Sequence, residues 1–367
     1  MEWILRGVYC WSEMQSFCHC LTIFNMTEGW QTLQNVCQVS YKQIFPFILM
    51  LAAVTNIINV AVLLRPVHRA SRTTSMPTRT HLVWLGLSHC VLCVTVTVAL
   101  IVRKKVSLVY TWAFYLAHLE EPIYNMFNCS CAFIILGVST DRYQAVCSPH
   151  KYSATLSYHK MPGRVALAYT VSAVMYFPSC FSQAPQYSDH HQGWYITKGA
   201  IFDTRAWMIW SVSLEVLHRF LPCALLVVLN LQILRAVVRL KFARTSVRTT
   251  ARAGGSRCEQ KIIYLLLTLT LTFLVINLPV AVLKTTYLVQ GQHCHTNVTL
   301  EVVRSVTNCL ELAGICSDFF LYFLMNPEYR RDVHSLMLCV FGLCGCCSSL
   351  TNCCPLQDSP DPHPTTT

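Results

Sequence analysis

Residues 44–64 read IFPFILMLAAVTNIINVAVLL and contain no Asp, Glu, Lys or Arg. A helix needs about 20 consecutive apolar residues to cross roughly 30 Å of hydrocarbon, because each residue adds about 1.5 Å. A polar or charged side chain in that layer would be expensive, and this stretch has no charge to bury. It therefore predicts a membrane-spanning helix.

Similar stretches recur along the chain. Four more windows lack charged residues, at 82–102, 122–140, 165–185 and 262–283. Two weaker windows are interrupted, 206–234 by Glu215 and Arg219, and 302–325 by Arg304, Glu311 and Asp318. Together they predict an all-α membrane protein with a seven-transmembrane helix bundle over residues 44–325. We expect an extracellular N-terminal arm at 1–43, and a short cytoplasmic amphipathic helix with a disordered tail at 326–367.

The composition excludes most other classes of protein. Only 12% of the 367 residues are charged, where a soluble chain carries about 25%, and 54% are hydrophobic. A disordered chain would be more polar, and the 21 cysteines are spread along the whole chain, unlike those of a small secreted disulfide scaffold. The net charge of +11 fits either nucleic acid or a membrane surface, so the location of the charges has to decide.

The basic residues predict the orientation. With the N-terminus outside, the cytoplasmic segments 65–79, 142–164, 235–261 and 326–367 hold 18 of the 28 Lys and Arg residues, and the outer segments hold 7. Basic residues gather on the cytoplasmic side of membrane proteins. We therefore expect a multi-pass plasma-membrane protein with an extracellular N-terminus, and no nucleic-acid partner. The sequons at Asn25 and Asn297 fall outside in this arrangement and predict N-glycosylation.

The end of the third window carries a specific motif, Thr140-Asp141-Arg142-Tyr143-Gln-Ala-Val-Cys147-Ser-Pro149. An acid and an arginine at the end of a membrane helix are costly unless they pair or meet water. The string resembles the DRYxAVCxP signature of rhodopsin-like (class A) G-protein-coupled receptors. Residues that match the family's helices one, five, six and seven follow in order, at Asn56, Pro222, Pro279 and Tyr322. The strings Asn277-Leu-Pro279 and Leu229-Asn230 further resemble FMRFamide-type neuropeptide receptors and related orphan receptors.

Some positions depart from the family's pattern in the middle of the bundle. Asn277 stands where most members have tryptophan, and Asp318 and Phe319 replace an Asn-Pro pair in helix seven. His89 replaces the acid of the family's sodium site, whose other members are reduced to Cys131 and Gly314. Because the hard oxygen donors are lost, we predict no sodium site, and we expect no other metal or cofactor. His89 either pairs with Asp318 or bonds to a backbone carbonyl.

The family's usual outer disulfide is also missing. Ala117 stands at the position of the helix-three cysteine, and residues 186–205 contain no cysteine. Both ends of the bond are therefore absent together.

The resemblance implies a cytoplasmic switch built from Asp141, Arg142, Tyr143, Glu259 and Tyr322. In the family, an arginine at this point holds helices three and six together until activation, and Glu259 is the acid that matches. Alternatively, Glu259 only complements the dipole at the start of its helix. Juxtamembrane cysteines follow at Cys344, Cys346 and Cys347, which suits palmitoylation, with unmodified thiols as the alternative.

Polar residues in the outer halves of the helices predict a ligand pocket. Tyr124, Asn125 and Asn128 follow Glu121 at helical spacing and share its face. The predicted pocket comprises Glu120, Glu121, Tyr124, Asn125, Asn128, Glu215, Lys284, Arg304, Asn308 and Glu311. Each charge at the membrane centre costs about 2.5–3.5 kcal/mol, so these side chains must meet water, a ligand or one another. Internal salt bridges are the alternative to a binding site.

These observations predict a receptor. We expect it to bind an extracellular polar ligand, of a peptide or amino-acid-like kind, and to activate heterotrimeric G proteins, with membrane lipids and arrestin as further partners. A non-signalling or decoy receptor homologue is the first alternative, because the helix-seven motif is altered and the disulfide is lost. A seven-span transporter or intramembrane enzyme fits less well, since no internal repeat, HExxH or GxSxG motif occurs. We therefore predict that the chain is not an enzyme.

Overall fold

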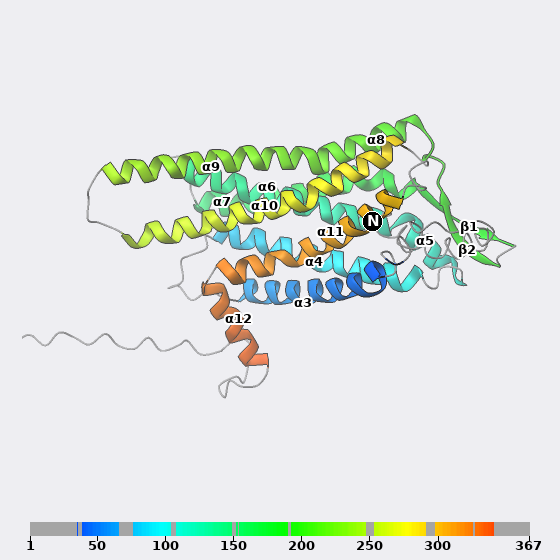
Figure 1. Ribbon diagram of the computed structural model, residues 1–367, viewed down its shortest axis with the longest axis horizontal. Coiled ribbons are helices and arrows are strands. Elements are labelled where there is room, and N and C mark those ends of the chain that lie inside the picture. The colour runs from blue at the N-terminus through cyan, green and yellow to red at the C-terminus, as the bar shows by residue number, and fades with distance from the viewer. Residues whose placement is uncertain are drawn as a thin grey trace, which may run out of the picture.

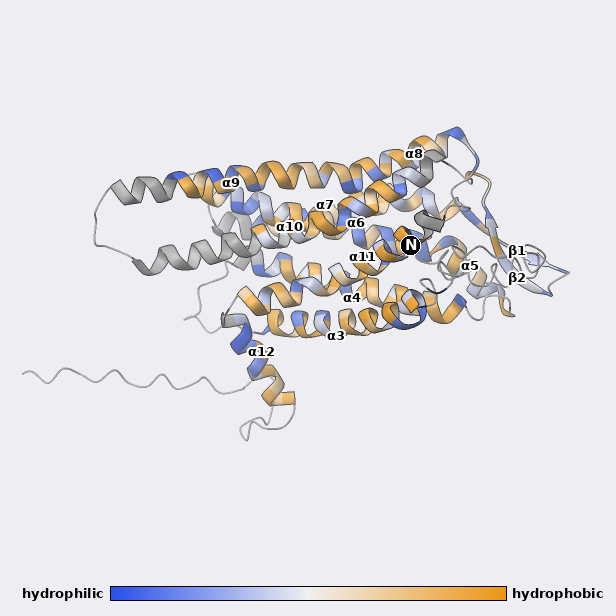
Figure 2. Ribbon diagram, in the orientation of Figure 1, coloured by the Kyte–Doolittle hydropathy of each residue, from blue (hydrophilic) through white to orange (hydrophobic). Residues whose placement is uncertain are grey.

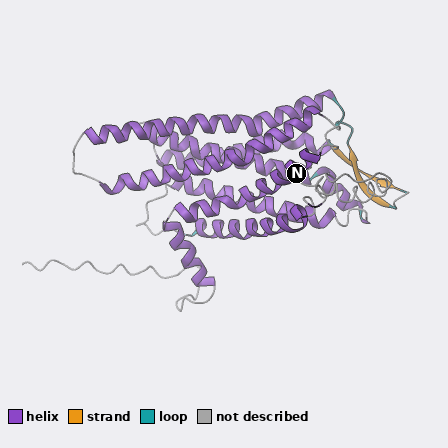
Figure 3. Cartoon of the chain, viewed as in Figure 1, coloured by secondary structure: helices purple, strands orange, loops and turns teal. Residues whose placement is uncertain are grey.

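A computed structural model describes residues 35, 39–65, 76–103, 108–148, 152, 154–189, 192–246, 253–290, 298–325 and 327–340. Long helices run side by side along the molecule (Figure 1), and a single hairpin of strands stands at one end (Figure 3). The elements are η1 (Ser40–Ile44), α3 (Phe45–Leu64), α4 (Met76–Arg103), α5 (Tyr110–His118), α6 (Glu120–Cys147), α7 (Ala154–Tyr176), η3 (Phe177–Phe181), β1 (Gln183–Ser188), β2 (Gly193–Lys198), α8 (Arg205–Glu215), η4 (Val216–Phe220), α9 (Leu221–Ser246), α10 (Ala253–Gln290), α11 (Val298–Met325) and α12 (Pro327–Val340).

The seven-helix bundle is confirmed. In the described part of the chain, its members are η1 with α3, α4, α5 with α6, α7, α8 with η4 and α9, α10, and α11. Five of these are long and apolar enough to cross a membrane, at Ser40–Leu64, Arg79–Arg103, Tyr110–Cys147, Arg205–Arg239 and Val302–Met325. They include both windows that charged residues interrupt, because a buried charge does not stop a helix whose backbone bonds are satisfied internally. The windows at 165–185 and 262–283 are represented by α7 and α10.

The core lies between α3, α4, α6 and α11, where apolar side chains such as Leu85, Leu92 and Ile134 are fully buried. Hydrophobic residues run along the long helices (Figure 2), and many large apolar side chains face outward, among them Phe47 and Ile57, which are more than half exposed. Lipid tails are as apolar as leucine, so a helix that crosses a membrane is expected to turn apolar side chains outward to the lipid.

The third helix is longer than predicted and has a break. Pro122 lies in the first turn of α6, where its missing N–H leaves the His118 carbonyl without an intrahelical donor. The chain changes direction at Leu119, and α5 ends at His118. This break sets α5 apart as a short outer segment beside the strands (Figure 1).

The predicted fourth span is wrong at its outer end. The window at 165–185 extends to Pro185, but α7 ends at Tyr176, and Pro185 lies in β1. Absence of charge marks an apolar segment and does not require it to be helical. The strands β1 and β2 pair antiparallel, from Gln183 opposite Lys198 to Ser188 opposite Gly193. The sequence analysis did not predict this hairpin.

The fifth helix contains a widened turn. η4 is a π-helical turn between α8 and α9, in which the Leu221 N–H bonds to the Val216 carbonyl. Pro222 follows at once and has no N–H for the regular ladder. Such bulges are frequent at functional sites, and this one carries His218 and Arg219 into the interior of the bundle.

Helix seven and α12 are fastened to α3. Asn56 donates a hydrogen bond of 2.9 Å to the Ile315 carbonyl of α11. The Tyr329 hydroxyl, at the start of α12, donates to Asn59 Oδ1 at 2.5 Å, and its ring centroid lies 5.8 Å from that of Tyr322. Burial raises the pKa of Tyr329, so the hydroxyl keeps the proton that it donates. α12 is therefore anchored to the bundle by a buried side chain, although its helix leaves the bundle at an angle (Figure 1).

Candidate functional site

Four buried charges form a cluster in the half of the bundle towards β1 and β2, which is called the outer half below. Arg219 on η4 is completely buried, and its Nε lies 3.1 Å from Glu215 Oε2 while its Nη2 lies 3.2 Å from Glu311 Oε1. Lys284 of α10 contributes the second cation, with Nζ 3.8 Å from Glu215 Oε1. We call Glu215, Arg219, Lys284 and Glu311 the charge cluster. Two cations and two acids meet there, so the cluster has no net charge.

Neutral amides extend the charge cluster to α6 and α10. Asn128 Nδ2 donates to Glu311 Oε1 at 3.0 Å, and Arg219 Nη1 donates to Asn277 Oδ1 at 3.2 Å. The cluster therefore links helices three, five, six and seven. In this arrangement the buried charges pair with one another, as in the alternative in which the polar residues of the predicted pocket form internal salt bridges.

A second polar pair lies beside the cluster. Tyr176 of α7 and His218 of η4 are both buried, and the hydroxyl lies 2.5 Å from His218 Nδ1. The sequence analysis included neither these residues nor Arg219 and Asn277 in the predicted pocket. The charge of Arg219 inside an apolar window was a visible signal, because such a residue needs buried partners. The other three gave no such signal.

Other predicted pocket residues point elsewhere. Glu120 is buried against α4, where its Oε2 accepts a hydrogen bond of 2.8 Å from Arg103 Nη2. Glu120 and Glu121 have different partners because neighbouring residues on a helix differ in direction by about 100°, and the pocket role of Glu120 stays a prediction. Glu121 Oε2 accepts from Gln183 Nε2 of β1 at 3.3 Å, so this acid faces the hairpin. Asn308 Nδ2 donates to the Tyr41 hydroxyl at 2.8 Å.

The side chains of the remaining members of the predicted pocket are buried inside the bundle. Tyr124 and Asn125 on α6 and Arg304 on α11 are each less than 5% exposed. The predicted set therefore divides into the charge cluster with Asn128, two acids at the outer end of α6, and residues held inside α6 and α11.

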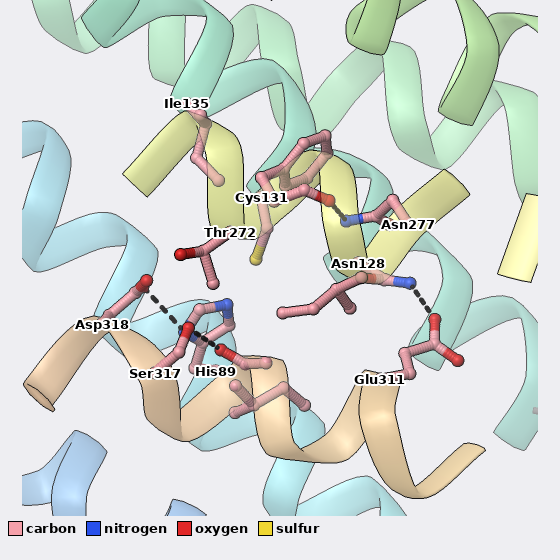
Figure 4. A pocket seen from close by; sticks show the side chains of 13 residues that line it. His89, Asn128, Cys131, Ile135, Thr272, Asn277, Glu311, Ser317 and Asp318 are labelled. Atoms are coloured by element: carbon pink, nitrogen blue, oxygen red, sulfur yellow. Dashed lines mark hydrogen bonds and ion pairs between the residues drawn. The ribbon is translucent and has the colours of Figure 1, made fainter. Parts of the chain in front are cut away.

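A small cavity of about 50 Å³ lies below the charge cluster, between α4, α6, α10 and α11 (Figure 4). Of the predicted pocket residues, Asn128 and Glu311 line it, at the end that Figure 4 shows opposite His89 and Asp318. A cavity of this size holds a few water molecules and no peptide. Gly314 makes the close approach of α11 to α10 possible, since a Cβ there would lie 2.7 Å from Ile276 Cδ1.

The predicted pair of His89 and Asp318 is confirmed. His89 Nδ1 lies 3.6 Å from Asp318 Oδ2, and both side chains are buried at the edge of the cavity. Cys131 faces the same space (Figure 4). Within the ranges that the structure describes, no three His, Cys, Asp or Glu side chains gather as metal ligands. The sodium prediction itself remains a prediction.

At the opposite end of the bundle, Asp141 is buried and its Oδ1 lies 2.5 Å from Arg164 Nη1 of α7. The sequence analysis did not identify this partner. Arg142 and Tyr143 follow Asp141 directly on α6 and are half-buried, and Tyr322 is buried in α11. Glu259 belongs to α10, but its side chain lies outside the described residues, so its link to Arg142 stays a prediction. The glycosylation and palmitoylation residues also lie outside the described ranges, at Asn25, Asn297, Cys344, Cys346 and Cys347.

The outer hairpin is joined to α5 without a disulfide. His118 Nδ1 lies 2.6 Å from the Cys180 carbonyl oxygen, just before β1. The ring of Trp194 on β2 lies 4.8 Å from Tyr110 and 5.3 Å from Tyr187, measured between centroids. These contacts occupy the region where Ala117 replaces the missing cysteine.

Comparison with known proteins agrees with this architecture. Residues 59–322 match the family model of the 7 transmembrane receptor (rhodopsin family). A probable G-protein coupled receptor of Caenorhabditis elegans is 24% identical over 307 residues, which cover 81% of this chain and 69% of the relative. A second probable G-protein coupled receptor of the same organism is 26% identical over 265 residues, covering 65% of this chain and 60% of that protein.

Proposed function

Since the chain belongs to the rhodopsin family of seven-transmembrane receptors, we propose that it binds an extracellular polar ligand and activates heterotrimeric G proteins. Members of this family are receptors and not enzymes, and the chain is a multi-pass membrane protein. The finer parts of the proposal are a peptide or amino-acid-like ligand, an extracellular N-terminus and residence in the plasma membrane.

The charge cluster carries the ligand part of the proposal. Arg219, Lys284, Glu215 and Glu311 come from three different helices and converge in the outer half of the bundle. A scaffold role alone is an expensive use of four charges, because apolar residues of similar volume often stabilise a buried site at least as well. A ligand with both an acidic and a basic group could exchange partners with the cluster. Mixed signs of charge suit a peptide or amino-acid-like ligand better than a lipid.

The inner end of α6 supports the signalling part. Asp141, Arg142 and Tyr143 match the family's coupling motif, and the segment 235–261 supplies eight basic residues on the proposed cytoplasmic side. A basic surface of this kind favours an acidic partner. We propose that the G protein binds here, that arrestin uses the same face, and that Arg142, Glu259 and Tyr322 act as the switch.

The subtype and the boundaries are also proposals. Asn277-Leu-Pro279 supports a relation to FMRFamide-type receptors. The receptor domain would cover 44–325, with the outer arm and the cytoplasmic tail as glycosylated and palmitoylated segments. A non-signalling receptor is a second candidate, because the helix-seven motif is altered at Asp318 and Phe319 and both cysteines of the family's outer disulfide are replaced.

A G-protein dissociation assay in transfected cells tests the function. Cells would express the wild-type chain or Arg142→Ala at matched surface level, with reporters for each class of heterotrimeric G protein. We expect basal dissociation of at least one class with the wild type and its loss with Arg142→Ala. Equal signals from both chains in every class, with or without pools of acidic and basic peptides, would favour the non-signalling alternative.

A further inference from the structure

Helix α10 contains a hinge in its outer half. Pro279 lies inside the helix and has no N–H for the carbonyl four residues earlier. A proline at this place weakens the ladder and allows the two arms of a helix to change their angle. Asn277 lies on the inner side of the hinge, and Lys284 lies on the outer side.

Helix five is joined to α10 on both sides of this hinge. On the inner side, Arg219 Nη1 donates to Asn277 Oδ1 at 3.2 Å. On the outer side, Lys284 Nζ lies 3.8 Å from Glu215 Oε1. Arg219 and Glu215 are one turn apart in the fifth helix. The two links therefore hold both arms of α10 to the same short segment, and this fixes the angle between the arms.

The two links differ in strength. Arg219 forms ion pairs with Glu215 at 3.1 Å and with Glu311 at 3.2 Å, and it donates hydrogen bonds to Glu311 and Asn277, so it has several close partners. Lys284 is buried, and among the described residues its only ion pair within 4 Å is the 3.8 Å contact with Glu215, while Glu311 and Glu121 act on its charge from further away and no hydrogen bond to its ammonium is found there. An ammonium group has three donors, and a buried charge with few partners is costly. The outer link is therefore the one that a competing anion can break.

We propose that Lys284 binds a carboxylate group of the ligand, and that this exchange releases the outer arm of α10 from Glu215. The inference rests on the proposed receptor function and names the chemical group that the outer site recognises. A carboxylate carries one negative charge and accepts hydrogen bonds, so it can pair with the single ammonium group of Lys284. Glu215 keeps Arg219 as its partner after the exchange, so no acid is left without a cation. The inner link through Asn277 stays in place.

Thermal unfolding of the purified full-length receptor in nanodiscs tests the carboxylate site, with potassium acetate as the probe and potassium chloride at equal ionic strength as the reference. The variant Glu215→Gln removes the competing acid, so acetate should bind Lys284 and raise Tm by about 4 °C when it exceeds its Kd about tenfold. The double variant Glu215→Gln with Lys284→Gln should lose this rise. Lys198→Gln is the matched control, because its pair with Asp203 is exposed on the hairpin.

Two outcomes overturn the site. Acetate that fails to stabilise Glu215→Gln, or that stabilises the double variant equally, shows that Lys284 does not bind a carboxylate. If Glu215→Gln does not fold, the wild type and Lys284→Gln are compared at higher acetate, where the same rise must appear in the wild type alone. These measurements need no G protein, so they decide the site even if the wild type never signals.

The release of α10 has a separate readout. Glu215→Gln and Lys284→Gln both break this link, so each should raise basal G-protein dissociation, and the double variant should not exceed Glu215→Gln, which also loses the pair with Arg219. Additive effects of the two variants would mean that they act separately and would contradict the link. A wild type that signals with no change in either variant would contradict it as well.

Discussion

Removing the guanidinium of Arg219 should destabilise the receptor more than removing any exposed cation. The variant Arg219→Gln keeps a polar side chain but leaves Glu311 without its cation and leaves Glu215 with only the 3.8 Å contact to Lys284. It also removes the donor to Asn277. All of these groups are buried, so water cannot replace the lost partner.

The magnitude follows from the distances. Two unit charges 3.2 Å apart attract with about 5 kcal/mol at an effective dielectric constant of about 20. Part of this is offset by desolvation, and loss of one partner of a buried pair costs about 3–5 kcal/mol in practice. At about 2–4 °C per kcal/mol, Tm should fall by about 10 °C.

Thermal unfolding in nanodiscs measures this fall, with Lys198→Gln as the control. The control breaks an exposed ion pair with Asp203, which is worth at most about 1 kcal/mol. The double variant Arg219→Gln with Glu311→Gln should recover part of the loss, because one unpaired acid is removed with its cation. A Tm for Arg219→Gln within about 2 °C of the control, or no recovery in the double variant, would refute the reasoning.

Three further predictions concern other parts of the bundle. Glu259→Ala should raise basal G-protein dissociation severalfold at matched surface expression, while Arg142→Ala should abolish it, and an unchanged basal signal in Glu259→Ala would count against the cytoplasmic lock. Replacing sodium by choline at equal ionic strength should leave Tm of the purified receptor unchanged, because His89 stands in place of an oxygen ligand; a stabilisation specific to sodium would show that the ion binds. Tyr329→Phe removes only the hydroxyl that donates to Asn59, so it should cost about 1 kcal/mol and lower Tm by about 3 °C, and no change would mean that ring packing alone holds α12.

The membrane-spanning helices could be predicted from the sequence because each one is marked by its own apolar residues. Residues 44–64 need no partner to be identified as a span, and His89 with Asp318 could be paired because the family alignment placed them opposite each other. Contacts that depend on the rotation of one helix against another could not be predicted. The link from Glu120 to Arg103 and the link from Asp141 to Arg164 both join residues on different helices, and their formation is decided by packing.

Local irregularities were also missed. The π-helical turn at η4 changes the direction of every side chain that follows it. No residue type in Val216–Phe220 indicates that this turn contains an extra residue. The strands at Gln183–Ser188 and Gly193–Lys198 are short and depend on each other for their hydrogen bonds, so neither shows a strong pattern alone.

The hairpin is held against α5 and α6 by noncovalent contacts, so a small fraction of molecules should have it detached at any temperature. The hydrogen bonds made by His118 and Glu121 and the ring contact of Tyr110 with Trp194 are worth about 3 kcal/mol together. A difference of that size leaves about one molecule in a hundred with the hairpin lifted at any moment. A covalent bridge would hold this population near zero at every temperature. The hairpin is therefore expected to open and close without any chemical change, and warming should raise the fraction of molecules in which it is open.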